Sequence, residues 1–179
     1  IGSFIGNGTV RVYAKGGAMG PATPAELDTM RAVVRNAMED GAFGVASALI
    51  YPPNTYASTE ELIEVNRAAA PYGGVYITHM RSEGDKFLDA MDEALRIGRE
   101  GGVPVEIYHL KASGPRNWPK MPRAIAKIDS ARAAGQDVQA NMYLYPAGGN
   151  SFASCIPPKY AAGGKLLEAA FGPAAQAVF

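Results

Sequence analysis

The sequence lacks the cysteines of a disulfide scaffold and the excess of basic residues that is typical of a nucleic-acid-binding surface. Its single cysteine allows no internal disulfide and favours a reducing compartment, so we expect a cytoplasmic protein. Lys and Arg number 17, as do Asp and Glu, and this zero net charge predicts no electrostatic attraction to nucleic acid or to an anionic membrane. No apolar stretch reaches the ~18 residues needed to cross a bilayer. The composition therefore favours a small molecule as the partner.

The sequence does contain enough apolar material for one packed domain. Hydrophobic residues make up 47% of the chain, and its 179 residues fall within the usual size of a domain. The chain opens with Ile1 instead of methionine, and residues 1–5 read like the middle of an apolar strand. We therefore expect further segments of the protein upstream of Ile1.

Helical and strand patterns alternate along the chain. Thr23 can cap a helix entered through Pro24, and the predicted helices span residues 23–40, 59–70, 86–99 and 123–134. Short apolar runs, typical of strands buried on both faces, follow them at residues 43–50, 75–80, 103–110 and 138–145. The strands begin about 30 residues apart, which is the length of one β–α crossover unit. This pattern predicts a parallel α/β domain, and both an open doubly wound sheet and a closed barrel fit it.

The chain has two histidines, and each ends a predicted strand in a matching context. His79 and His109 both follow a strand-forming run and precede an apolar residue and then a cation. If the two strands are adjacent and parallel, they lie ~4.8 Å apart, so the imidazoles can converge on one ion, and two imidazoles suit zinc. Because side chains alternate along a strand, Arg81 would share the face of His79 and Lys111 that of His109. We therefore expect a cation beside the metal.

Other interpretations of these residues stay open. A lone histidine at a strand end is more often a hydrogen-bonded structural residue than a ligand, although two in matching positions favour ligands. A catalytic zinc commonly has three protein ligands and a water, so further ligands are needed. Cys155 is a candidate, but its apolar context favours a small buried residue. Solvated faces and caps account for the carboxylates on or near the helices, Asp85, Asp92, Glu93 and Asp137.

Several longer motifs occur in one order along the chain. They lie at residues 41–44, 51–57, 73–81, 109–111, 117–118, 131–138 and 143–145, followed by 157–158 and 163–164. Over roughly residues 1–164 this series resembles the N-acyl-D-amino-acid deacylases, or D-aminoacylases, of the metal-dependent amidohydrolase superfamily. Several linked motifs in order are more specific than any one of them.

The resemblance implies a distorted (β/α)8 barrel with a small β-sandwich domain and with zinc at the carboxyl ends of the strands. Residues 1–179 would be an internal fragment of that barrel, from about its third strand to its seventh. His79 and His109 match the metal-binding histidines of the fifth and sixth strands. The family's His-x-His motif, its bridging cysteine or carboxylate and its general-base aspartate would lie outside the chain, in the remaining segments of the enzyme.

The resemblance also implies zinc-dependent hydrolysis of a C–N amide bond, namely deacylation of N-acyl-D-amino acids. Lys111 and Tyr143 match residues that contact the carboxylate of the substrate, although Tyr143 could equally be an aromatic that fills the barrel mouth. Two alternatives are a cyclic-amide hydrolase similar to dihydroorotases and a non-catalytic fragment or degenerate barrel.

The chain departs from the family pattern at three places. Asn7 stands where relatives usually carry histidine, and Asn141 stands where many carry aspartate, so both positions lose an ionisable group. Residues 147–152 also diverge, in a loop that would help to shape the substrate pocket. These departures bear on the choice of substrate.

Overall fold

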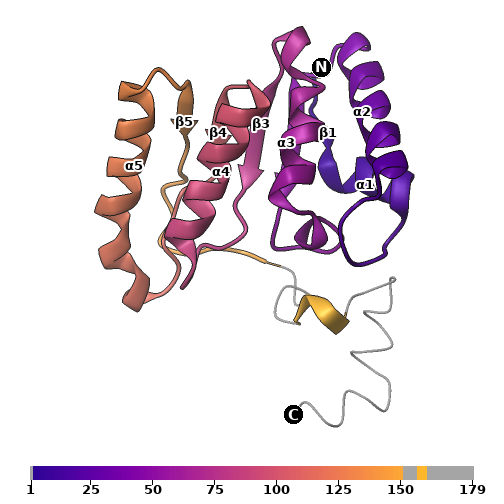
Figure 1. The fold of residues 1–179 in the computed structure, drawn as a ribbon. Coiled ribbons are helices and arrows are strands. Elements are labelled where there is room, and N and C mark those ends of the chain that lie inside the picture. The colour runs from indigo at the N-terminus through magenta and orange to yellow at the C-terminus, as the bar shows by residue number, and fades with distance from the viewer. Residues whose placement is uncertain (1, 151–156, 161–179) are drawn as a thin grey trace, which may run out of the picture.

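Five parallel strands form a single sheet in the computed structural model, which describes residues 2–150 and 157–160 (Figure 1). The strands are β1 (Ile5–Gly6), β2 (Gly44–Ala48), β3 (Val75–His79), β4 (Val105–Ile107) and β5 (Val138–Ala140). Their spatial order is the same as their order in the sequence, and every neighbouring pair is parallel. The predicted parallel α/β arrangement is therefore confirmed.

The connections between the strands are helical. The helices are α1 (Asn7–Lys15), α2 (Pro24–Glu39), α3 (Thr59–Arg67), α4 (Phe87–Gly101) and α5 (Met121–Ala133). Each helix packs against the next along the chain, and α2 to α5 form a layer over the sheet (Figure 1). An open doubly wound sheet reverses its strand order at a switch point, whereas a (β/α)8 barrel keeps sequential order. The sequential order of these five strands therefore matches a segment of a barrel.

The core lies between this helical layer and one face of the sheet. A row of buried side chains crosses the sheet in register on that face: Val45, Tyr76, Val105 and Val138. The neighbouring row, on the opposite face, is mixed: it contains Ala46, the buried Ile77, the half-buried Glu106 and the exposed Gln139. Burial of each large apolar side chain contributes about 1.5–3 kcal/mol, so this one-sided packing fixes which face of each strand meets the helices.

Local signals explain where two of the helices begin. At the start of α2, the Thr23 hydroxyl accepts from the Glu26 amide at 3.3 Å, and the Glu26 carboxylate accepts from the Thr23 amide at 2.7 Å. Ser58 caps α3 by accepting from the Glu61 amide at 3.1 Å. These caps satisfy backbone donors that have no partner inside the helix, and the cap of α2 was predicted.

Helix α1 was not predicted. Gly8 and the β-branched Thr9, Val10 and Val12 all have low helix propensity. In the structure Val10 is fully buried in the cluster formed with α2 and β2. Helical stability in proteins comes mostly from such packing, which here outweighs the local preference.

Two strands are shorter than the sequence patterns suggested. The predicted strands at 103–110 and 138–145 end at Ile107 and Ala140. The residues beyond them lie on loops at the carboxyl edge of the sheet. Among the described residues, no helix has the length and apolarity needed to span a membrane.

Candidate metal centre

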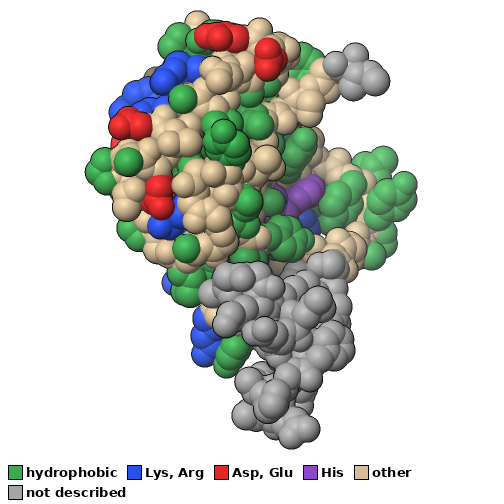
Figure 2. Space-filling model, turned by 90° about the vertical axis from the view of Figure 1, so that its right-hand side faces the viewer, with side chains coloured by type: hydrophobic (Ala, Val, Ile, Leu, Met, Phe, Trp, Pro, Cys, Tyr) green, Lys and Arg blue, Asp and Glu red, His purple; other side chains and the backbone are tan. Residues whose placement is uncertain are grey.

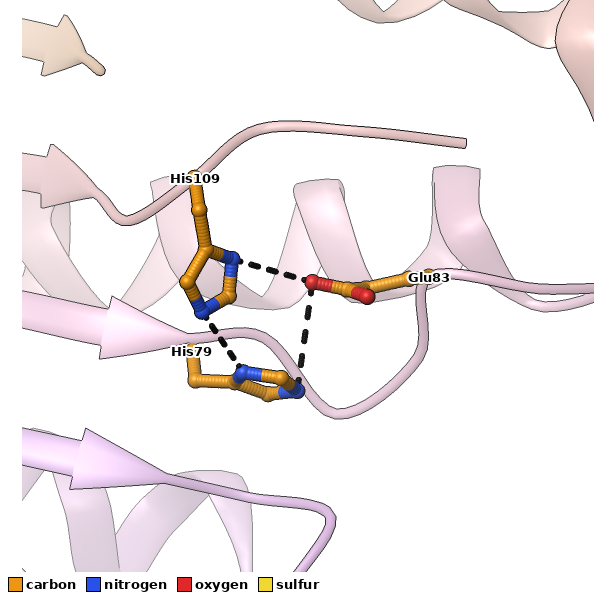
Figure 3. Close-up of side chains that lie close together, drawn as sticks. All are labelled: His79, Glu83 and His109. Carbon is orange, nitrogen blue, oxygen red and sulfur yellow. Dashed lines mark hydrogen bonds and ion pairs between the residues drawn. The ribbon is translucent and has the colours of Figure 1, made fainter. Parts of the chain in front are cut away.

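His79 and His109 come together at the carboxyl edge of the sheet. His79 is the last residue of β3, and their rings lie 4.5 Å apart at 75°, with His79 Nδ1 2.9 Å from His109 Nε2 (Figure 3). In the surface view the histidines are set back in a hollow and flanked by hydrophobic side chains (Figure 2). The adjacency of the two parallel strands, which was expected from the sequence, is present.

The equal register predicted for the two histidines is wrong by one residue. Thr78 is paired with Ile107, so continuation of the ladder places His79 opposite Tyr108, and the Tyr108 amide donates to the Thr78 carbonyl at 3.0 Å. His109 lies one step further, beyond the end of β4. Its backbone has a left-handed φ of 37°, which is uncommon for a residue with a side chain. A turn at His109, and not strand register, brings its ring to His79.

Glu83 is the third member of the cluster, and sequence reasoning missed it. Its Oε1 atom lies 3.1 Å from His109 Nδ1 and 3.9 Å from His79 Nε2, and its side chain is only 14% exposed. One ligand atom from each of the three residues falls within 4.8 Å of the others. One feature of the sequence could have pointed to Glu83: it stands four residues after His79, on the loop that follows the same strand.

The donor set and its environment fit a metal ion. His79 Nε2 is buried and has no hydrogen-bond partner among the described residues. Burial lowers the pKa of His79, and the neighbouring charges of His109 and Lys111 lower it further, whereas Glu83 opposes them. A neutral imidazole is the form that binds metal, and two imidazoles with one carboxylate form a known zinc donor set. A bound ion would also satisfy a buried nitrogen that is otherwise costly to leave unpaired.

Lys111 and Tyr143 both lie beside His109. The Lys111 ammonium donates to Glu83 Oε1 at 2.6 Å and lies 3.0 Å from His109 Nδ1. The Tyr143 ring is centred 6.4 Å from the His109 ring and 5.4 Å from Lys111 Nζ. Since β4 ends before these residues, strand alternation does not place Lys111 here. The loop that carries Lys111 is held instead by the Ser113 amide, which donates to the Glu83 carbonyl at 2.7 Å.

Arg81 does not border the histidines as expected. Strand β3 ends at His79, and the Arg81 guanidinium turns to Glu93 on α4, with Nε–Oε2 and Nη2–Oε1 distances of 2.8 and 2.9 Å. The interpretation of Glu93 as a solvated carboxylate is therefore also wrong, because its side chain is only 12% exposed and is bound by Arg81. Asp85 and Asp92 do form exposed ion pairs, with Arg116 and Lys127.

The two asparagines that depart from the family pattern both support loops at this edge. Asn141 accepts from the His109 amide at 2.8 Å and donates to Glu106 at 2.7 Å, so it holds the backbone of a candidate ligand. Asn7 is buried at the start of α1 and donates to Asn54 Oδ1 at 2.8 Å. Cys155 lies outside the described residues.

Comparison with known proteins places this arrangement in a family. No protein-family model matches the chain. D-aminoacylase from Alcaligenes xylosoxydans xylosoxydans is 40% identical over 145 residues, which are 81% of this chain and 30% of that protein. N-acyl-D-glutamate deacylase from the same organism is 35% identical over 146 residues, or 82% and 30% of the two chains. The matched part of this chain is homologous to the D-aminoacylases. It spans about a third of the length of these curated relatives.

Solved structures of the D-aminoacylase family agree with this assignment. A crystal structure of D-aminoacylase, described as defining a novel subset of amidohydrolases, matches with a TM-score of 0.77 and 41% identity, over 81% of this chain and 30% of that one. The N-acyl-D-glutamate deacylase from Bordetella bronchiseptica, complexed with zinc and a phosphonate inhibitor, matches with a TM-score of 0.77 and 33% identity, over 80% and 30%. The family resemblance and the barrel-type fold class inferred from the sequence are confirmed.

Proposed function

We propose that this chain is the central part of the barrel of a zinc-dependent amidohydrolase that deacylates N-acyl-D-amino acids. Residues 1–179 would supply about the third to the seventh strand of that barrel. The observation that carries the proposal is the convergence of His79 and His109 at the carboxyl edge of a parallel sheet. Active sites of such barrels lie at this edge. The sequence identity to D-aminoacylase then selects the chemistry among the many that the fold supports.

In this proposal His79 and His109 hold the zinc, and Glu83 offers a carboxylate oxygen to the same ion. When bound, zinc polarises a carbonyl and lowers the pKa of its water towards ~7. The described residues around the pair hold it in place: Asn141 fixes the backbone of His109, and Glu83 braces both imidazoles from one side. The general-base aspartate and the remaining ligands would come from other segments of the same enzyme.

Lys111 and Tyr143 would recognise the carboxylate of the substrate. The Lys111 side chain is 22% exposed, so an incoming anion can reach it, and Glu83, which lies 2.6 Å from its ammonium, keeps it beside His109. Ammonium-to-carboxylate hydrogen bonds are charge-assisted and about twice as strong as neutral ones. The Tyr143 ring lies next to this ammonium and closes one side of the same space. These contacts favour a small substrate with one carboxylate near the scissile amide.

Two further parts of the proposal concern the location of the protein in the cell and the molecules that it binds. We infer a cytoplasmic location from the single cysteine, and a small carboxylate-bearing substrate as the partner in place of a nucleic acid or a membrane. The remaining segments of the barrel would be the other partner of this chain.

The test uses the protein expressed from its full reading frame. Purified protein is assayed with N-acyl-D-amino acids, their L enantiomers and cyclic amides such as dihydroorotate, and its metal content is measured. We expect bound zinc and hydrolysis of the D substrates, with neither property in the His79→Asn variant. Hydrolysis of cyclic amides alone would replace the proposal with the cyclic-amide alternative, and a zinc-free, inactive protein would favour a non-catalytic role.

A further inference from the structure

Arg81 lies on the loop after β3, and its guanidinium makes four hydrogen bonds. Besides its two bonds to Glu93, its Nη1 atom donates to the Thr55 carbonyl at 3.0 Å and its Nη2 atom donates to the Ala57 carbonyl at 2.9 Å. Glu93 in turn accepts from the Thr59 hydroxyl, at the start of α3, at 2.8 Å. One guanidinium therefore connects the loop after β3, helix α4 and the loop after β2.

The loop after β2, residues 49–58, forms the neighbour of His79 at the carboxyl edge. The Leu49 amide donates to the His79 carbonyl at 3.0 Å, and the Tyr51 ring is centred 5.9 Å from the His79 ring. At its far side the loop is held by Asn7, which donates to Asn54. Two tyrosines of the loop also bind the chain beyond β5, since Tyr51 donates to Asn150 and Tyr56 donates to the Pro158 carbonyl. Arg81 supplies a further anchor, on the side nearer to α4.

The packing of α3 on α4 has other support. Apolar side chains from both helices, among them Leu62, Ile63 and Met91, share one buried cluster. The two carbonyls that Arg81 binds belong to the loop and not to these helices. The loop, and not the helix pair, is therefore what depends on the guanidinium.

We propose that Arg81 is a positioning residue, which with Glu93 fixes the loop at residues 49–58 against His79 and so sets one wall of the substrate pocket. The proposal rests on the proposed function in that the pocket is taken to be the one at the metal pair. Lysine cannot replace arginine here, because the planar fork engages a carboxylate and two carbonyls at once, whereas an ammonium is a single point charge.

A cavity beside Arg81 makes the proposal open to chemical rescue. It has a volume of about 360 Å³ and is lined by Arg81, Glu93, Thr59, Ser82, Lys86 and Asp89. A methylguanidinium ion in solution can reach Glu93 through this space once the side chain of residue 81 is shortened.

The experiment compares three variants of the full-length protein, Arg81→Ala, Arg81→Lys and the control Arg96→Ala. Arg96 also links α4 to α3, through Glu60, and pairs with Glu100 on its own helix, but it does so on the exposed side. The measurements are zinc content, kcat and KM, and amide hydrogen exchange of residues 55–57, whose backbone hydrogen bonds lie within the loop.

Both Arg81 variants should exchange these amides faster and lose roughly tenfold to a hundredfold in kcat/KM, since a displacement of about 1 Å near the reacting groups has effects of this size. Zinc content should stay at the level of the unmodified protein. Methylguanidinium should restore part of kcat/KM to Arg81→Ala and none to Arg81→Lys, whose side chain still fills the space. Arg96→Ala should behave like the unmodified protein in all three measurements.

Unchanged exchange and kinetics in Arg81→Ala would overturn the proposal. Zinc lost in proportion to activity would also overturn it, since Arg81 would then act on the ligand and not on the loop. If the unmodified protein deacylates no substrate, the proposed function fails, and hydrogen exchange alone tests whether Arg81 holds the loop. Faster exchange at residues 55–57 in Arg81→Ala would support this role of Arg81, and unchanged exchange would refute it.

Discussion

Two of the clusters of charged side chains among the described residues differ in what can reach them. Arg11 and Glu61 form a buried ion pair at 2.5 Å, with side chains 0% and 3% exposed, and Glu61 also accepts from the Ala22 amide at 3.0 Å. Glu83 lies with His79 and His109 at the carboxyl edge of the sheet, where the histidines are seen in a hollow (Figure 2). The first cluster cannot exchange partners with solvent, whereas the second can.

This difference in accessibility separates a cluster that holds segments of the chain together from a cluster that can bind an ion. The Arg11 guanidinium also binds the carbonyls of Ala18 and Gly20, so the pair ties the segment between α1 and α2 to α3. In the open cluster, one imidazole nitrogen of His79 has no partner among the described residues. Buried pairs that are broken destabilise strongly, whereas an accessible donor set with a spare nitrogen can take up an ion.

The largest effect is expected from His79→Asn in the full-length protein. Removal of this imidazole should abolish zinc binding and reduce deacylation to background, because only Glu83 and His109 of the donor set would remain and neither can take the place of the lost nitrogen. The metal-free form should lose only about 1 kcal/mol of unfolding free energy, the amount of one modest hydrogen bond. Metal analysis, activity and urea unfolding check this, and a variant that kept its zinc would contradict the assignment of His79.

The next effect is expected from Arg11→Met, which breaks the closed cluster. The variant should lose about 3–5 kcal/mol of unfolding free energy, because Glu61 would remain as an unpaired buried charge. The double change Arg11→Met with Glu61→Leu should recover most of the loss, since well-packed apolar residues often replace a buried pair without cost. Urea unfolding measures both, with Arg31→Met as the control, since Arg31 pairs with Glu64 and Asp28 at side chains that are 30% and 70% exposed.

If Arg11→Met cost no more than Arg31→Met, the closed cluster would not differ energetically from a surface pair. The contrast between the two clusters would then rest on accessibility alone.

A smaller effect is expected from Lys111→Met in the open cluster. Loss of one charge-assisted hydrogen bond to the substrate should cost ~1.5–3 kcal/mol, or roughly a tenfold to hundredfold fall in kcat/KM, with zinc content unchanged. Substrates with an amidated carboxylate should be affected far less. The matched control is Lys127→Met, which removes an ammonium bound to Asp92 on the outer surface. Equal losses for both substrates would refute the role in carboxylate recognition, and depleted zinc would place Lys111 in the support of the metal.

The smallest effect is expected at a site that belongs to neither cluster. Thr23→Ala at the start of α2 should lower the unfolding free energy by about 1 kcal/mol, the usual contribution of a helix N-cap, whereas Thr29→Ala inside the same helix should change it less.

The hydrogen bond from the Thr23 backbone lowers the pKa of Glu26. The contribution of this hydrogen bond to the unfolding free energy is therefore present above the ordinary pKa of a glutamate and is lost as the pH falls through the lowered pKa of Glu26. Urea unfolding at several pH values can follow this loss.

Local patterns in the sequence determined much of the architecture. The alternation of amphipathic and apolar segments predicted four helices and their strands near their observed positions, because burial of one face imposes a period on the residues. The matching surroundings of His79 and His109 predicted that the two would meet, since parallel neighbouring strands end at the same edge of a sheet.

Tertiary structure alone decided the rest of the candidate site. Glu83 reaches the histidines, and Lys111 reaches its predicted place beside them, through loops whose paths depend on contacts between segments distant in sequence, such as the bond from Ser113 to Glu83. Arg81 leaves the histidines for Glu93 because β3 ends two residues earlier than alternation requires. Helix α1 forms against its own propensities because Val10 is buried by partners outside the segment. A periodic pattern of residues indicates which face of a helix or strand is buried. The course of a loop depends instead on contacts with residues distant in sequence, which no local pattern can predict.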